Sequence, residues 1–203
     1  MKSFAHRLPK CPARSFHKRA AEHIPEALRP ALEPILEQIS SLTERIRQYD
    51  RKLETICEEH YPQTELLRQV EGIGPLTALT FVLTLEDPYR FEKSRSVGAY
   101  LGLVPARDHS GDRDPQKHIS KEGNEMLRKL LVGSAHYILG PFGSDSDLRR
   151  HGEKIASRGA KNAKKRAVVA VARKLAVLLH SLWISGEVYE PLRNTHRSGV
   201  RAA

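Results

Sequence analysis

The feature that most constrains the fold is a heptad repeat of apolar residues in the first third of the chain. Apolar side chains recur at alternating spacings of three and four, at Leu32, Ile35, Ile39, Leu42, Ile46, Tyr49, Leu53 and Ile56. Charged residues of both signs flank this seam, a pattern typical of one long helix that packs against a second helix through a narrow stripe. We therefore predict a coiled-coil segment over residues 28–60, ended by Pro62. The second helix comes either from another copy, giving a homo-oligomer through residues 32–56, or from the chain's own helices.

No segment after the seam shows a convincing strand pattern, apart from the chance of a short hairpin within residues 105–120. We therefore predict a mainly α fold, in which the coiled-coil helix is followed by a helical domain over residues 61–190. Residues 1–27 lack periodicity and carry no acid before Glu22, so we expect a disordered basic arm. Residues 191–203 are expected to form a flexible tail.

The charge of the chain indicates a polyanionic partner. The 203 residues carry a formal net charge of +10 and have a pI of about 9.8, and folded proteins this basic usually bind nucleic acid. The longest apolar stretch, residues 167–184, is interrupted by Arg173, Lys174 and His180, so we expect a buried helix and no membrane partner. Cys11 and Cys57 offer no disulfide framework, which fits a reducing cytoplasm and a nucleoid-associated protein.

A Gly-apolar-Gly turn divides the segment after the coiled coil. Thr64 can start a short helix, Gly72-Ile73-Gly74 forms a tight turn, and Pro75 suits the first position of a second helix. The second helix has an apolar face formed by Leu76, Leu79, Val82 and Leu83. This order is that of a helix-hairpin-helix unit, in which Gly72 and Gly74 let backbone N–H groups face a phosphate. A plain turn between two helices is the alternative.

Two further helices are expected after the loop at residues 106–120. The first, over residues 120–139, is predicted to bury Met126, Leu127, Leu130, Leu131, Ala135 and Ile138 and to direct Arg128 and Lys129 outward. The second follows a segment, residues 148–174, that carries ten Lys and Arg residues against one acid, Glu153. Charge of one sign favours phosphate binding through Lys161, Lys164, Lys165 and Arg166 over an ordinary solvated face.

The loop itself contains the candidate reactive side chain. Ser110 precedes a glycine and lies near Arg113, Lys117 and Lys121, with His109 beside it. A serine nucleophile needs activation and positive charge to stabilise the phosphate oxygens, although a serine before glycine is more often a turn residue. The aspartates at 108, 112 and 114 are typical turn formers, so no metal site is expected.

An ordered series of motifs resembles one protein family. The motifs G-I-G-P, A-Y-L-G-L-V-P, S-G and I-S-K-x-G-N-x-x-L-R occur in this order at close spacing, followed by "KNAKKRAVVAVARKLAVLLHSLW". Over residues 30–190 the chain resembles the DEDD-type insertion-sequence transposases of the 110/116/902 group, which are related to Piv-type site-specific invertases.

The resemblance implies roles for several residues. Ser110 matches a serine that forms a phosphoserine link to DNA, and Gly72 and Gly74 match the hairpin glycines. The motif that opens the next helix, which is either structural or faces a phosphate, is matched by Ser120, Lys121, Gly123, Asn124 and Arg128. The family also implies a structured guide RNA and a RuvC-like domain that holds Mg²⁺ through Asp and Glu residues. No such domain is recognisable in the 203 residues, so we expect no cofactor in this chain and a truncated transposase.

These observations leave two functions open. In the first, the chain takes part in DNA transposition or site-specific recombination, with Ser110 as nucleophile and a RuvC-like domain supplied in trans. In the second, it is a catalytically inactive nucleic-acid-binding and dimerisation module left from a decayed transposase. A structural basic protein would share the charge but gives no reason for the ordered motifs.

Overall fold

The computed structural model describes residues 7–106 and 118–194, which divide into two compact units, one up to Thr55 and one from Ile56 onward. Within the described residues the fold is mainly α, as predicted. The only extended pairing found in these ranges is a single antiparallel bridge between Pro105 and Ile119.

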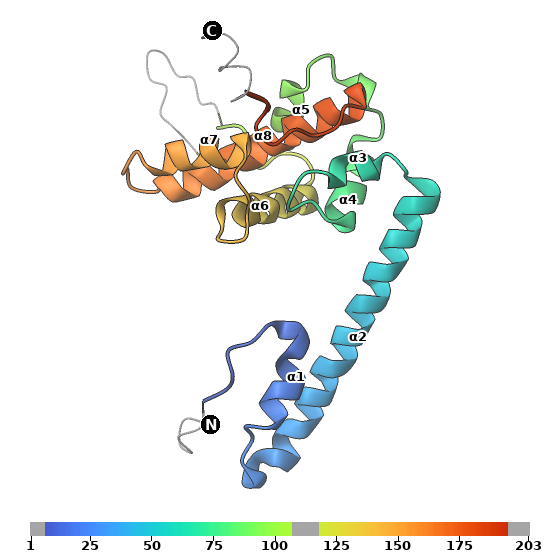
Figure 1. Ribbon diagram of the computed structural model, residues 1–203, viewed down its shortest axis with the longest axis vertical. Coiled ribbons are helices and arrows are strands. Elements are labelled where there is room, and N and C mark those ends of the chain that lie inside the picture. The colour runs from blue at the N-terminus through green and yellow to red at the C-terminus, as the bar shows by residue number, and fades with distance from the viewer. Residues whose placement is uncertain (1–6, 107–117, 195–203) are drawn as a thin grey trace. The chain divides into compact units, whose positions relative to one another are not determined.

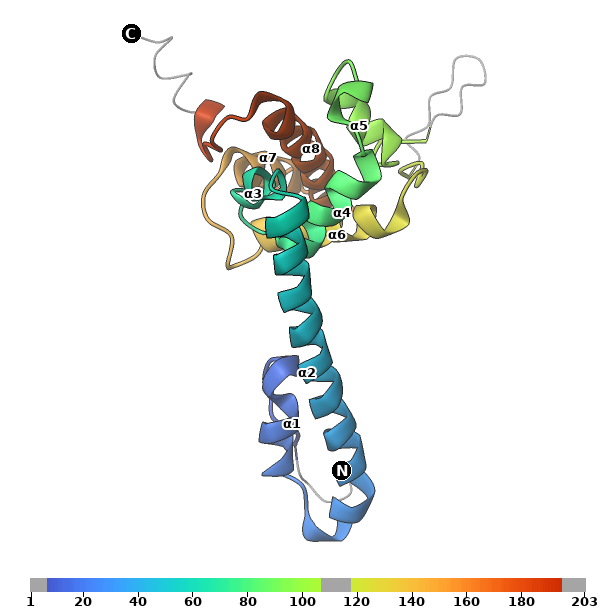
Figure 2. The ribbon, with the colours of Figure 1, turned by 90° about the vertical axis from the view of Figure 1, so that its right-hand side faces the viewer.

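The first unit begins with a helix that the sequence did not predict. Helix α1 (Ala13–Ala21) is followed by a 3-10 turn, η2 (Glu26–Leu28), and lies beside the first part of α2 (Figures 1 and 2). Ala20 of α1 and Ile24, in the connection after it, are buried. The prediction of a disordered arm is therefore wrong for residues 13–21, because a few small and apolar side chains suffice to fix a short helix against a longer one.

Helix α2 (Arg29–His60) has the bounds expected of the coiled-coil segment. Its seam is exposed in the described chain: the exposed fractions are 54% for Ile35, 55% for Leu42, 61% for Ile46 and 65% for Tyr49. On its flank, Glu44 accepts hydrogen bonds from Arg47 (3.2 Å) and Arg51 (3.1 Å). The described residues of this chain thus cover Leu32, Ile39 and Leu53 in part and leave the rest of the seam exposed, and pairing with a second helix stays a prediction.

The second unit packs its helices around the longest of them, α8 (Figure 1). In chain order these elements are α3 (Thr64–Arg68), α4 (Pro75–Leu85), η3 (Pro88–Arg90), α5 (Arg95–Tyr100), α6 (Glu125–Leu139), α7 (Asp147–Ala156) and α8 (Ala163–Ser185). Helix α8 contacts α3, η3, α5, α6 and α7. It is therefore the element that fixes the positions of the others.

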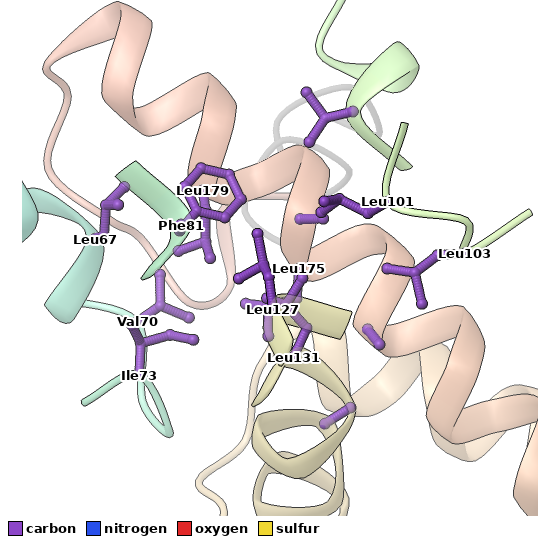
Figure 3. Close-up of a cluster of buried hydrophobic side chains, with 14 of the residues drawn as sticks. Leu67, Val70, Ile73, Phe81, Leu101, Leu103, Leu127, Leu131, Leu175 and Leu179 are labelled. Carbon is purple, nitrogen blue, oxygen red and sulfur yellow. The ribbon is translucent and has the colours of Figure 1, made fainter. Parts of the chain in front are cut away.

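The core is a continuous apolar cluster on one side of α8 (Figure 3). Leu175 and Leu179 of α8 are fully buried against Leu127 and Leu131 of α6 and Phe81 of α4. By length and composition alone α8 could cross a membrane, with a mean hydropathy of 1.7. Its apolar side chains instead form this core, which agrees with the expected buried helix.

His180 ties the segment before α5 to α8. The imidazole is fully buried, and its Nε2 lies 2.8 Å from the Pro88 carbonyl oxygen while its Nδ1 lies 3.0 Å from Ser94 Oγ. Because a carbonyl oxygen can only accept, Nε2 is the donor. Phe91 packs edge-on against the ring, with centroids 5.6 Å apart. The polar group is thus satisfied inside the core, and η3 and α5 are held on α8.

Candidate nucleic-acid interface

The two ends of the loop that contains Ser110 are joined by backbone hydrogen bonds. The Ala106 N–H donates to the His118 carbonyl and the Ser120 N–H donates to the Val104 carbonyl, each at 2.9 Å. Together with the Pro105–Ile119 bridge these bonds form the stem of a short hairpin. The hairpin considered for residues 105–120 is therefore present at its base. Ser110, Arg113 and Lys117 lie outside the described residues.

Two glycines allow the chain to cross itself directly beneath this stem. Gly102 and Gly123 have φ values of +64° and +74°, a conformation that residues with a Cβ rarely adopt. A Cβ on Gly102 would also collide with the backbone of Glu122, and one on Gly123 with the carbonyl of Tyr100. The glycines of the A-Y-L-G and K-x-G-N motifs are therefore required for backbone contact, and they bring the two arms of the stem together.

Arg128 stabilises this crossing through hydrogen bonds to two backbone carbonyl groups. One of its guanidinium nitrogens donates to the Leu101 carbonyl (3.2 Å) and to the Glu122 carbonyl (2.7 Å), and the residue is only 9% exposed. Its predicted outward position is wrong, because two carbonyls distant in sequence attract the guanidinium inward. Lys129 does face solvent, paired with Glu125. We therefore assign Arg128 a role in supporting the hairpin. Its guanidinium is not exposed for the predicted phosphate contact.

The other two residues of the motif also have local structural partners. Asn124 is the N-cap of α6, where its side-chain oxygen accepts a hydrogen bond from the Leu127 N–H at 2.9 Å. Lys121 has a φ of +60° and donates its backbone N–H to the Gly102 carbonyl, while its side chain is exposed. Lys121 remains available for phosphate contact, whereas the Asn124 side chain is occupied in starting the helix.

The glycine turn has the geometry expected between two helices. Gly72 has a φ of +87° and lies against Tyr137 of α6, while Gly74 is the N-cap of α4 and has open space beside it. Pro75 occupies the first turn of α4, as predicted. Glu71 accepts hydrogen bonds from the N–H and the hydroxyl of Ser144, which lowers the pKa of this carboxyl. The start of α4 is therefore accessible on a well-held turn; its contact with a phosphate stays a prediction.

A group of exposed cations lies on the end of α7, the connection after it and α8. We call it the α7–α8 basic surface and define it by its exposed residues Lys154, Arg158, Lys161, Lys164, Lys165, Arg166, Arg173 and Lys174. Within residues 7–106 and 118–194, none of these side chains forms an ion pair with a carboxylate. The sequence analysis indicated the basic segment 148–174 as a whole and named Lys161, Lys164, Lys165 and Arg166 as its phosphate contacts.

Two arginines of the same segment have different partners. Arg149 donates to the carbonyls of Ile138, Gly140 and Gly143 at 2.7 to 3.0 Å and pairs with Glu153. Arg150 pairs with Asp145 at 2.6 Å. These two arginines hold the connection between α6 and α7, so the basic residues of the segment divide into a structural part and an exposed, unpaired part.

No group of three or more His, Cys, Asp or Glu residues in the described chain could hold a metal ion. The family resemblance assigns Mg²⁺ to the RuvC-like domain and not to these residues, and no step through a metal is derived from them. What the arrangement offers is a cationic surface and a hairpin on a rigid base.

Sequence comparisons give the family of this helical domain. Residues 64–147 match the family model described as "Transposase IS116/IS110/IS902 family". The C-terminal part of the chain therefore belongs to the IS116/IS110/IS902 transposase family, which confirms the resemblance inferred from the motifs.

Individual relatives are insertion-sequence proteins of bacteria. The chain is 32% identical over 148 residues to the transposase for insertion sequence element IS1111A of Coxiella burnetii, covering 72% of this chain and 39% of that protein. It is 28% identical over 169 residues to a probable family 20 transposase of Pseudomonas aeruginosa, covering 83% and 49%. The chain thus spans less than half the length of these relatives.

Proposed function

We propose that the chain acts in DNA transposition as a nucleic-acid-binding part of an insertion-sequence transposase. The observation that carries this proposal is the α7–α8 basic surface, whose side chains are exposed and unpaired in the described residues. Solubilising surfaces normally mix both signs of charge, whereas a row of cations of one sign fits the phosphates of a nucleic acid. Family membership makes DNA the expected partner, and the same surface suits the backbone of a structured guide RNA.

Salt dependence tests this binding directly. Each phosphate that a protein neutralises releases counterions, so a protein with six phosphate contacts loses about 10³ in affinity between 50 and 200 mM salt. We expect a loss of this order for a duplex DNA probe, measured by fluorescence anisotropy. An affinity that does not change with salt, or no binding at 50 mM, contradicts the proposal.

We further propose that Ser110 is the nucleophile of strand exchange, acting with a metal-binding RuvC-like domain. This rests on the match of Ser110 to the S-G motif, and it is supported by the rigid base that Gly102, Gly123 and Arg128 give the loop. A loop whose ends are fixed loses less entropy when it positions a reactive group.

A serine substitution tests the catalytic role. With a RuvC-like domain supplied in trans, Ser110→Ala is expected to bind DNA like the wild type but to form no covalent protein–DNA product on denaturing gels. Ser120→Ala, in the hairpin stem, is the matched control and should retain the product. A product that persists in Ser110→Ala excludes Ser110.

The alternative function is a binding and dimerisation module without catalysis. The exposed seam of α2 favours a role in self-association, which does not depend on Ser110. This alternative is preferred if the wild type binds DNA and self-associates but forms no covalent product with any complementing domain.

A further inference from the structure

His151 lies at the junction of α7 and α8, at the edge of the α7–α8 basic surface. It directly precedes Gly152, where the two helices approach so closely that a Cβ would lie 2.7 Å from Val171 Cγ2 of α8. Gly152 and Val171 are buried, whereas the His151 side chain is half-buried and has no hydrogen-bond partner among the described residues. Its imidazole therefore lies at the rim of a helix contact, where an anion from solvent can reach it.

The charges that face His151 are positive. Lys154 follows it at a spacing of three, which places both on the same side of α7, and Arg158 lies just after the end of this helix. Lys174 approaches from α8, one turn after Val171. These three cations and partial burial lower the pKa of His151 below its ordinary value of 6.5, with burial as the largest cause.

The acids of the same helix are engaged elsewhere. Asp147, one turn before His151, accepts hydrogen bonds from the N–H and the side-chain amide of Asn194. Glu153 pairs with Arg149 at 2.8 Å. Neither carboxylate contributes to the pKa shift of His151. An anion that enters from solvent would therefore be the first negative charge to lie beside the imidazole.

We propose that His151 is a phosphate-contacting residue of the nucleic-acid interface and takes up a proton when a backbone phosphate binds between it and Lys154, Arg158 and Lys174. The proposal rests on the nucleic-acid binding proposed above and names a contact outside the segment 161–166. The proton comes from solvent, and the imidazolium then donates a charge-assisted hydrogen bond to a phosphate oxygen.

Proton uptake makes binding depend on pH in a defined direction. A phosphate raises the pKa of His151 in the complex above its lowered value in the free protein. Affinity is therefore constant at high pH, increases as the pH falls through the pKa of the complex, and levels off below the pKa of the free protein. Since one pKa unit corresponds to a tenfold change, we expect duplex DNA to bind about three- to tenfold more tightly at pH 5.5 than at pH 8.

The experiment compares the wild type with His151→Gln, His151→Lys and the control His136→Gln, an exposed histidine of α6. Anisotropy titrations with duplex DNA at fixed low salt are made from pH 5.5 to 8. The increase at low pH should be lost in His151→Gln and kept in His136→Gln. His151→Lys carries a permanent charge and should bind at pH 8 about as tightly as the wild type binds at pH 5.5.

Histidine NMR gives an independent measurement, because addition of DNA should raise the pKa of His151. The proposal is overturned if His151→Gln keeps the full pH dependence, or if DNA leaves the His151 titration unchanged. Salt-sensitive binding would then still support the nucleic-acid function, whereas no binding at any pH refutes both.

Discussion

Helix α2 and the α7–α8 segment are both rich in charge and apolar residues, yet they leave opposite kinds of surface exposed. In α2 the charges have both signs and pair locally, as Glu44 does with Arg47 and Arg51, while the apolar seam is exposed. In α8 the apolar face is buried in the core and the cations outside it are unpaired.

The contrast indicates two different partners. An exposed apolar stripe flanked by mixed charges suits another helix, because burial of the stripe is favourable and the flanking charges can pair across the contact. An exposed surface of one sign of charge repels copies of itself and attracts a polyanion. We therefore expect self-association through α2 and nucleic-acid binding through α7 and α8, as separable properties.

The largest effect is expected from charges in the seam. If α2 pairs with α2 of a second copy, Leu42→Glu with Ile46→Glu removes four buried side chains from a dimer, each worth roughly 1.5–3 kcal/mol. The variant should be a monomer in sedimentation equilibrium at concentrations where the wild type is a dimer. Ser41→Glu with Gln48→Glu, which adds the same charge outside the seam, should remain a dimer. A monomeric wild type would show that the seam has another partner.

A smaller effect is expected from charge reversal on α8. Lys164→Glu, Lys165→Glu and Arg166→Glu together should lower DNA affinity by about 100-fold, or about 2.8 kcal/mol. The salt slope should fall by about 0.9 for each phosphate that the variant no longer neutralises. The matched control is Arg45→Glu, Arg51→Glu and Lys52→Glu in α2, which changes the net charge equally. If both variants weaken DNA binding equally, the affinity depends on net charge alone. The expected difference between α2 and the α7–α8 basic surface is then wrong.

Local pattern was sufficient to predict α2 and α8, but not α7. The heptad spacing gave α2 within a residue of its observed start, and the apolar stretch of residues 167–184 gave the buried helix α8. In each case the periodicity of the helix itself decides which residues share a face. Helix α1 was missed because nine residues with one buried alanine carry too little periodic signal.

The position of individual cations could not be predicted in the same way. Arg128 and Arg149 look like surface residues in the sequence, but both donate to backbone carbonyls that lie elsewhere in the chain. Conversely, Met126 was expected inside and is 52% exposed, whereas Leu127 in the same turn of α6 is fully buried. Such outcomes depend on tertiary contacts, which motif spacing does not specify.

The smallest expected effect concerns the stability of the fold. Cations at the start of α8 and at the end of α7 should change the melting temperature in opposite directions. Lys164, Lys165 and Arg166 lie in the first turn of α8, which contains no acid and has no side-chain cap at Asn162. Cations there oppose the helix dipole at a cost of about 0.3–1 kcal/mol each. The triple reversal that weakens DNA binding should therefore raise the melting temperature, by about 2–4 °C for each kcal/mol gained.

Lys154 is the matched control, because it lies in the last turn of α7, where a cation is favourable. Lys154→Glu should also weaken DNA binding, yet it should lower the melting temperature. Both shifts should shrink in 1 M salt, where exposed charges are screened. If the triple reversal destabilises the fold instead, the three cations have intramolecular roles and the surface is not held free for phosphate. If the triple reversal stabilises the fold and weakens DNA binding, these cations destabilise the start of α8. Their role is then to bind the partner.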